Sequence, residues 1–199
     1  DDAATPAVGL RRDGAGMSCE RGGEPEVLWQ GKWLRMMRRG SWEYVERTNA
    51  GGVSVIIIAA TPERRLVFVE QTRVPIQSKT IEMPAGLVGD FDAEESLLVA
   101  AERELLEETG WRAGKLEYLM TGPSSAGMST ELMAFVRARE LVREHDGGGD
   151  ESEDFVVHEI EISDAPRWLA QKMAEGYSID AKVWAGLYFL ERNPDGSPA

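Results

Sequence analysis

Seven residues between positions 89 and 110 have the types and the spacing that binding of a divalent cation requires. Four are glutamates on one predicted helix and the turn before it, with one arginine among them. Carboxylates packed this closely disfavour one another's charge unless a cation lies between them, and oxygen ligands of this kind suit Mg²⁺ or Mn²⁺. The alternative is a solvated acidic helix face, as most glutamate-rich helices have. The seven are Gly89, Glu95, Arg103, Glu104, Glu107, Glu108 and Gly110.

Helical geometry places the acidic side chains of this segment on one face. At about 100° per residue, Glu104 and Glu108 lie one turn apart, and Glu107 widens the same acidic face. The apolar residues repeat at the spacing of a core-facing stripe next to it. One face would therefore hold the helix in the protein while another offers carboxylate oxygens to a ligand.

The ends of this helix are predicted from capping residues. Asp92 is a good N-cap, and Glu95 follows three residues later, as in a capping box. Gly110 suits a left-handed stop. The sequence therefore predicts a helix that begins at Asp92 and ends at Gly110.

The segment resembles the Nudix box, the signature of the Nudix hydrolases, and departs from it only at Trp111, where the family usually has an aliphatic residue. The resemblance implies an α/β (α+β) fold, an α/β/α sandwich with a mixed sheet. It also implies hydrolysis of a nucleoside diphosphate linked to another group. It assigns metal binding and catalysis to Glu104 and Glu108 and a contribution to metal binding to Glu107. It assigns to Glu95 and to Arg103, also of the catalytic set, the role of orienting that cluster.

A longer stretch, from about residue 33 to residue 190, resembles the branch of the family that cleaves ADP-ribose and other nucleoside diphosphate sugars. That branch carries an antiparallel sheet before the Nudix core and exchanges it between two subunits. Here residues 27–50 would form the sheet, and the protein would be a homodimer. Trp42 and Tyr44 in its hairpin are candidates for substrate contact.

The same resemblance assigns further contacts around the box. Arg73, at a predicted strand end, would meet the diphosphate, a task suited to a permanently charged, two-pronged donor. Glu82 would bind the substrate, and the carbonyl of Ala85 would join the metal ligands. Met128 and Glu131, in the loop after the box, would also contact the substrate.

One departure in that loop bears on the choice of substrate. Ala126 stands where the ADP-ribose enzymes have a proline, which weakens the case for ADP-ribose in particular. A nucleoside diphosphate sugar is still the favoured substrate class. GDP-mannose, dinucleoside polyphosphates, coenzyme A and damaged nucleotides stay open as alternative substrates. A non-catalytic Nudix domain that binds a nucleotide sugar also stays open.

Hydrolysis needs a group that accepts a proton from the attacking water. The acidic run 150–154 follows the glycines at 147–149, which we read as a flexible element within a loop. It matches the acidic loop from which the branch draws its base. The match assigns the base to Glu151 and a metal or water contact to Glu153, although a run of this kind is commonly a solvated charge cluster.

Composition limits the remaining possibilities. The 199 residues carry a net charge of −13, which argues against nucleic acid or an anionic membrane as the main partner. The sequence shows no secretory signal and no apolar run long enough to cross a membrane. Cys19 is the only cysteine, so no internal disulfide can form, and a reducing cytoplasm is the expected compartment.

Three segments are expected along the chain: a flexible N-terminal arm over 1–26, the antiparallel sheet over 27–50, and the Nudix domain over 51–199. The arm is an extension, a cloning remnant or a segment ahead of a start at Met17. Alternation and β-branched runs predict strands, and apolar periodicity predicts two more helices after the box. The predicted strands are 32–39, 41–48, 53–60, 66–71, 116–120, 132–137 and 155–162, and the helices are 164–175 and 180–191.

Overall fold

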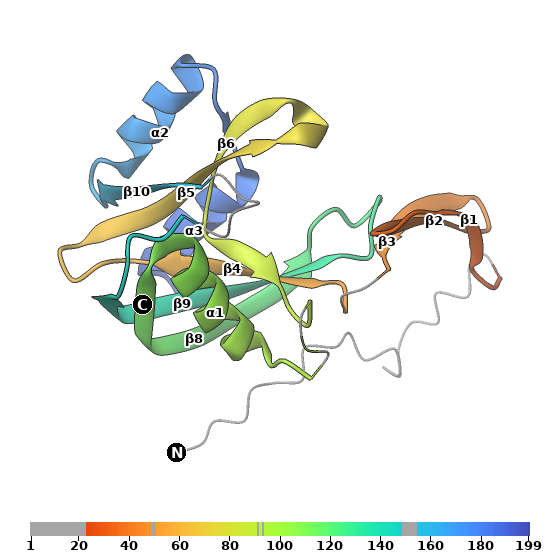
Figure 1. The fold of residues 1–199 in the computed structure, drawn as a ribbon, viewed down its shortest axis with the longest axis horizontal. Coiled ribbons are helices and arrows are strands. Elements are labelled where there is room, and N and C mark those ends of the chain that lie inside the picture. The colour runs from red at the N-terminus through yellow and green to blue at the C-terminus, as the bar shows by residue number, and fades with distance from the viewer. Residues whose placement is uncertain (1–22, 49–50, 91, 93, 149–154) are drawn as a thin grey trace.

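The computed structural model is an α/β/α sandwich with a small separate sheet at its N-terminal end (Figure 1). The expected fold class, with parallel and antiparallel pairing mixed, is confirmed. The described residues are 23–48, 51–90, 92, 94–148 and 155–199.

The described chain alternates strands with few helices. Most predicted elements are present, and the differences lie mainly at element ends and in short strands. The strands are β1 Glu26–Gln30, β2 Leu34–Arg39, β3 Trp42–Arg47, β4 Val53–Ala59, β5 Arg65–Arg73, β6 Ser78–Glu82, β7 Ala85–Leu87, β8 Trp111–Pro123, β9 Leu132–Arg143, β10 Val156–Glu161 and β11 Ser178–Ile179. The helices are α1 Leu97–Thr109, α2 Ala165–Ala174, α3 Ala181–Glu191 and the short 3₁₀ turn η1 Val74–Ile76.

Two four-stranded sheets form the centre of the sandwich. One has the order β7-β4-β9-β8, with β4 and β9 parallel, and the other has the order β10-β5-β6-β11, with β6 and β11 parallel. The remaining neighbours in both sheets are antiparallel. This arrangement brings β7 beside α1, and β11 leads directly into α3. Helices flank the central strands on both sides (Figure 1).

The core is built on both faces of β4, as its unbroken β-branched run predicts. Val55 and Ile57 pack into the cluster that includes the apolar face of α1. Ile56 and Ile58 point the other way, into the cluster with residues of α2 and α3. Because the period of a strand is two, one strand fixes both layers of the sandwich.

The predicted start of the box helix is wrong. Helix α1 begins at Leu97, and its N-cap is Ser96, whose hydroxyl accepts a hydrogen bond from the backbone N–H of Val99 at 3.4 Å. The carbonyl of Asp92 instead accepts from the N–H of Glu95 at 2.9 Å, in a turn ahead of the helix. Aspartate and serine are both good N-cap residues. Because Asp92 takes part in the turn ahead of the helix, Ser96 is the N-cap here.

The predicted end of α1 is confirmed, since Gly110 has φ 74° and its N–H bonds to the carbonyl of Leu106. The chain after it returns to this end of the helix. The N–H of Gly148 donates to the carbonyl of Glu108 at 2.8 Å, and a Cβ on Gly147 would lie 2.5 Å from the carbonyl carbon of Thr109. Gly147 and Gly148, the first two glycines of the predicted flexible element, therefore contact the end of the helix.

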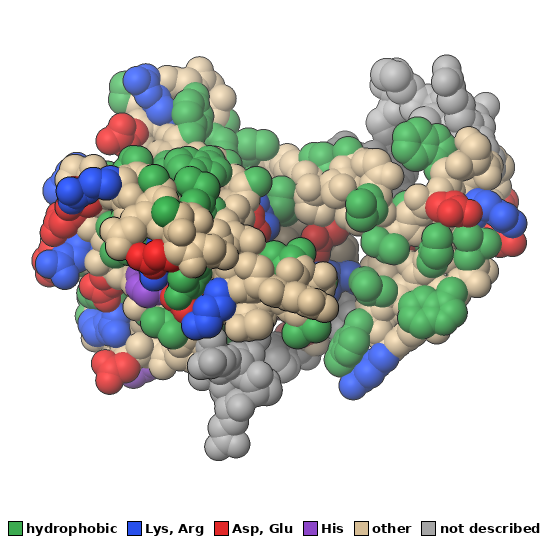
Figure 2. Space-filling view, turned by 90° about the horizontal axis from the view of Figure 1, so that it is seen from above, with side chains coloured by type: hydrophobic (Ala, Val, Ile, Leu, Met, Phe, Trp, Pro, Cys, Tyr) green, Lys and Arg blue, Asp and Glu red, His purple; other side chains and the backbone are tan. Residues whose placement is uncertain are grey.

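The N-terminal sheet has three strands in the order β1-β2-β3, one more than the predicted hairpin. It extends from one side of the molecule (Figure 1) and joins the rest by two backbone hydrogen bonds, Val45 N–H to Met128 O and Thr130 N–H to Val45 O. Figure 2 shows hydrophobic side chains gathered on its surface. Trp29 and Trp42 are among the large apolar side chains that lie exposed on the sheet.

Candidate active site

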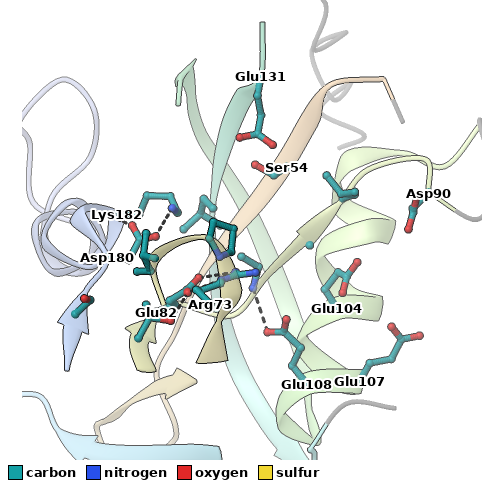
Figure 3. Close-up of a pocket in the computed structure, with 18 of the residues that line it drawn as sticks. Ser54, Arg73, Glu82, Asp90, Glu104, Glu107, Glu108, Glu131, Asp180 and Lys182 are labelled. Carbon is teal, nitrogen blue, oxygen red and sulfur yellow. Dashed lines mark hydrogen bonds and ion pairs between the residues drawn. The ribbon is translucent and has the colours of Figure 1, made fainter. Parts of the chain in front are cut away.

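A cavity of about 760 Å³ lies between α1 on one side and the β11–α3 junction on the other, with the β5–β6 hairpin between them (Figure 3). Most of its charged lining comes from elements far apart in sequence. Its carboxylates are Glu82, Asp90, Glu104, Glu107, Glu108, Glu131 and Asp180, and its cations are Arg47, Arg73, Arg103 and Lys182.

Helix α1 supplies the acidic wall of this cavity. Glu104 and Glu108, one turn apart, both point into it, so the two principal carboxylates share a face (Figure 3). Glu108 is buried and accepts a hydrogen bond from the backbone N–H of Ala85 at 3.1 Å. Gly86 lies directly against Glu104, because a Cβ there would be 1.9 Å from the carboxyl carbon. Strand β7 therefore fixes both side chains by close backbone contact.

Arg103 holds the acids of the box apart and in place. Its guanidinium donates to Glu95 at 2.8 and 3.1 Å, to Glu104 at 2.8 Å and to Glu107 at 3.2 Å. It also donates to the carbonyl of Leu87 at 3.3 Å. The hydrogen bonds from Arg103 outweigh partial burial and hold the pKa of Glu95 below its ordinary value. Arg103 thus contacts three of the four box glutamates.

Arg73 and Glu82 form a two-pronged pair in the floor between the walls. Nε and one terminal nitrogen of Arg73 donate to the two oxygens of Glu82, each at 2.7 Å. Thr80 adds a third hydrogen bond to Glu82 at 2.5 Å. Burial alone would raise the pKa of Glu82, but the bonds from Arg73 and Thr80 outweigh it and keep that pKa below its ordinary value. Glu82 is therefore ionised at neutral pH and orients Arg73.

Two further ion pairs line the cavity. Arg47 of β3 donates to Glu131 at 2.9 and 3.0 Å, which joins the N-terminal sheet to the site. On the wall opposite α1, the ammonium of Lys182 bonds to Asp180, the N-cap of α3. Figure 3 shows Glu131 and the Asp180–Lys182 pair on different sides of the Arg73–Glu82 pair.

The charges of the described lining favour a cation. Seven carboxylates face four cationic side chains, so a phosphate substrate would meet net repulsion without added positive charge. No group of three or more His, Cys, Asp or Glu side chains among the described residues already converges as a metal cluster. The donor chemistry nevertheless fits a hard cation, because Glu104 and Glu108 offer only oxygen and project into one cavity.

The cavity does not include every predicted contact. Trp42 is 60% exposed and Met128 is 64% exposed, and neither these two nor Tyr44 is part of the described lining. The acidic residues Glu151 and Glu153 lie outside the described residues. Arg73, Glu82, Ala85 and Glu131 all line the cavity together with the acids of the box.

Sequence reasoning missed four charged lining residues, namely Arg47, Asp90, Asp180 and Lys182. Asp180 and Lys182 lie far from the box in sequence, and the pairing of β11 with β6 brings them to the cavity. The sequence placed Asp180 only at the start of a predicted helix, 180–191, and gave it no function.

A family model described as the NUDIX domain matches residues 50–183. The chain is 32% identical over 140 residues to an ADP-ribose pyrophosphatase of Bacillus subtilis, covering 69% of this chain and 71% of that protein. It is 32% identical over 151 residues to a GDP-mannose pyrophosphatase of Escherichia coli, covering 72% and 75%. A protein named methanol dehydrogenase activator, from Bacillus methanolicus, is 32% identical over 139 residues, covering 69% and 71%.

Among solved structures, one titled as an ADP compounds hydrolase superposes with a TM-score of 0.60 at 22% identity, covering 73% of this chain and 82% of that one. At that identity the likeness supports the fold. The family match and the relatives above support more, and the chain belongs to the Nudix family of hydrolases. The expected class, an enzyme acting on phosphorus-containing anhydrides, is confirmed.

Proposed function

We propose that the protein hydrolyses the diphosphate bond of a nucleoside diphosphate sugar, of the ADP-ribose or ADP-sugar type, with Mg²⁺ as its cation and Mn²⁺ as a substitute. The products would be a nucleoside monophosphate and a sugar phosphate. The observation that carries the proposal is one cavity in which Arg73 lies between the acidic wall of Glu104 and Glu108 and a second polar wall. The two relatives named as pyrophosphatases of nucleotide sugars point to the same substrate class.

Arg73 would bind the diphosphate. Its pair with Glu82 uses two N–H donors of the guanidinium, and an arginine has five. The remaining donors can meet phosphate oxygens while Glu82 keeps the guanidinium plane fixed. Charge-assisted hydrogen bonds between a guanidinium and a phosphate require a defined geometry. Glu82 would provide it by holding Arg73 in one orientation.

Glu104 and Glu108 would hold the cation, with the Ala85 carbonyl, Glu107 and Glu153 contributing. Bound there, a divalent cation would neutralise phosphate charge and lower the pKa of water. Family members generally use divalent cations, and the acidic excess of the cavity is consistent with that need. Arg103 would keep Glu104 and Glu107 separated when the cation is absent.

In the proposed reaction the oxygen of water bonds to one phosphorus, and the bond from that phosphorus to the bridging oxygen breaks. The second phosphate leaves with the electron pair of that bond. The proton lost by water passes to a carboxylate, which we assign to Glu151 because its acidic segment follows Gly147 and Gly148, held at the end of α1.

Replacement of Glu151 by glutamine should lower the rate constant for hydrolysis strongly and leave substrate affinity nearly unchanged.

We also propose that the protein is a homodimer in which the N-terminal sheet reaches the partner's site. The observation that supports this is the exposure of Trp29 and Trp42 on the sheet. Trp42 or Tyr44 would then contact a nucleobase across the dimer.

No described helix is long and apolar enough to cross a membrane. We propose the cytoplasm as the compartment on the basis of the single cysteine, which can form no internal disulfide.

A hydrolysis screen with Mg²⁺ tests the function directly. Substrates should include ADP-ribose, ADP-glucose, GDP-mannose, UDP-glucose, a diadenosine polyphosphate and coenzyme A. We expect turnover of at least one sugar-linked diphosphate, with release of a nucleoside monophosphate. Binding without turnover across the whole panel would instead identify a non-catalytic nucleotide-sugar domain.

A further inference from the structure

The cavity has a wall that the box chemistry does not use. It is formed at the junction of β11 and α3 and faces the acids of α1 across the Arg73–Glu82 pair (Figure 3). Its polar side chains are Asp180 and Lys182, and Ser178 lies beside them. A linear diphosphate bound at the centre must direct one of its two substituents toward this wall.

The charge of this wall is balanced. The carboxylate of Asp180 accepts from the backbone N–H of Lys182 at 2.8 Å and from its ammonium group. The Lys182 side chain is about a quarter exposed, at 26%, and Asp180 is similar at 21%. A third phosphate placed here would meet Lys182 but be repelled by Asp180. The pair therefore suits a neutral ligand that both donates and accepts hydrogen bonds.

The residue types of the lining disfavour a nucleobase as the neutral ligand at this wall. Within the described residues, no aromatic side chain lines the cavity, so a nucleobase would find no ring to stack on at this wall. Stacking is the usual way proteins hold bases without reading their edges. Hydroxyl groups on a saturated ring need no such platform. They need close pairs of donors and acceptors, which is what Lys182, Asp180 and Ser178 offer.

The hydroxyl of Ser178 is itself positioned. It forms a 3.1 Å hydrogen bond to the hydroxyl of Ser78 on the neighbouring strand, and β11 pairs in parallel with β6 at Ser178 and Thr80. Asp180 is fixed as the N-cap of α3, and its own N–H bonds to the carbonyl of Ile81. The wall is thus built on rigid backbone, as a selective subsite requires.

We infer that Asp180 and Lys182 form the subsite for the sugar of the substrate, binding neighbouring hydroxyls of the ring through the carboxylate and the ammonium group. The inference rests on the proposed function, since it gives the sugar a place in the same cavity. It makes Asp180 and Lys182 determinants of specificity that take no part in the bond-breaking step.

The test compares two substrates in Lys182→Met and Asp180→Asn variants. One is the best nucleoside diphosphate sugar from the screen, and the other is the β-methyl ester of the same nucleoside diphosphate, which keeps the diphosphate and lacks the ring. Asparagine caps helices about as well as aspartate, so Asp180→Asn preserves the start of α3. Both variants should raise KM for the sugar substrate about tenfold, the size of one hydrogen bond to a charged group. KM for the methyl ester should stay within about twofold, since the ester makes none of those bonds.

A matched control is available on α2. Asp164 precedes that helix and pairs with Arg167 at 3.0 Å, outside the cavity. The Asp164→Asn and Arg167→Met variants should leave both KM values unchanged. Equal losses for the two substrates in the α3 variants, or no loss in either, would overturn the sugar subsite.

Binding by calorimetry separates this inference from the proposed function. If the wild-type protein cleaves neither ligand, the proposed function fails, yet the sugar-bearing ligand should still bind more tightly than the methyl ester. That preference should be lost in Lys182→Met. A wild-type protein with no preference for the sugar-bearing ligand would contradict the subsite whatever its activity.

Discussion

Gly86 shows how closely the acids of the site are held by backbone. A methyl group on its Cα would lie 1.9 Å from the carboxyl carbon of Glu104, so the carboxylate occupies the place of a side chain. The glycine is needed here for space. The φ angle of Gly86 is not positive, so the backbone conformation does not itself require a glycine at this position.

Replacement of Gly86 by alanine should therefore displace Glu104 with little effect on the backbone. We expect Mg²⁺-dependent turnover to fall by about 100-fold, the upper range for disturbing the support of a metal ligand. Steady-state kinetics and a circular dichroism spectrum check this. Gly122→Ala is the control, because a Cβ there makes only ordinary contact, 3.5 Å from the Met120 methyl. Full activity in Gly86→Ala would remove Glu104 from the site.

Glu70 provides a pH test at the same scale, outside the cavity. It is buried on β5 and accepts from Lys79 at 2.8 Å and from Tyr177 at 3.3 Å, and lies 3.0 Å from Nε2 of His158. Burial would raise the pKa of Glu70, but the hydrogen bonds from Lys79 and His158 outweigh it and leave that pKa below the ordinary 4.5. The ionised form therefore stabilises the fold above about pH 4.5, and this contribution is lost as pH falls through the lower folded pKa.

The Glu70→Gln variant should be less stable than the wild type at pH 7, by about 1–3 kcal/mol. The difference should shrink as the pH is lowered below 4.5, the ordinary pKa of the side chain. Urea denaturation at several pH values measures it. A difference that stays constant down to pH 3 would show that the charge of Glu70 contributes nothing.

Residue types and spacing were enough to find the acids of the box, because a helix places positions four apart on one face. The same reasoning could not find Asp180 or Lys182, since their place in the cavity depends on a short parallel strand pair. The sequence also did not show that Arg73 and Glu82 would bond to each other across two strands.

At the scale of elements, the end of α3 depends on one buried arginine of β9. Arg137 is 2% exposed, and its guanidinium donates to the carbonyls of Phe189 and Arg192 and to the side chain of Asn193, each at 3.0 Å. Burial lowers its pKa. The terminal carbonyls of a helix lack partners within the helix, so Arg137 completes α3 and fixes the segment after it.

Removal of these donors by Arg137→Met should cost about 2–4 kcal/mol of unfolding free energy, because buried carbonyls would be left without partners. Arg137→Lys should recover only part of the loss, since an ammonium group cannot reproduce the planar fork. Chemical denaturation of both variants measures the effect. Wild-type stability in Arg137→Met would mean that water replaces the guanidinium at no cost.

Element types were predicted better than element ends. The β-branched run of β4 and the apolar stripe of α1 carry a period that predicts strand and helix. The start of α1 was placed at Asp92 because two capping residues compete within five positions, and the turn at 92–95 is not visible in the sequence. The hairpin acquired a third strand, Glu26–Gln30, whose residues show little alternation and are exposed throughout.

At the scale of the whole molecule, the N-terminal sheet is the feature that a single chain explains least well. Trp29 and Trp42 on its strands and Trp33 in the turn between β1 and β2 are all exposed. Figure 2 shows hydrophobic side chains gathered on this part of the surface, and such a group is typical of an interface. The net charge of −13 would keep copies apart unless such a surface is buried.

Sedimentation should therefore give twice the mass of one chain. Substitution of Trp29 and Trp42 by glutamate should lower the association constant by about 100-fold or more, since hot spots of this type commonly carry at least 2 kcal/mol each. Arg167→Glu, on the far side of the molecule, is the control. A monomeric wild-type protein at micromolar concentration would contradict the proposed exchange of the sheet.

The Glu108→Gln variant tests whether the carboxylates of α1 make phosphoanhydride hydrolysis depend on a divalent cation. The variant keeps the size of the side chain and an oxygen that can accept from the Ala85 N–H, while Glu102→Gln on the same helix, paired outside the cavity with Arg112, serves as control. Turnover measured against Mg²⁺ concentration should saturate in the wild type and in the control, and a chelator should abolish it in both. In Glu108→Gln the maximal turnover should be lower by at least about 100-fold. Wild-type rates in Glu108→Gln, or activity that persists in excess chelator, would contradict the account.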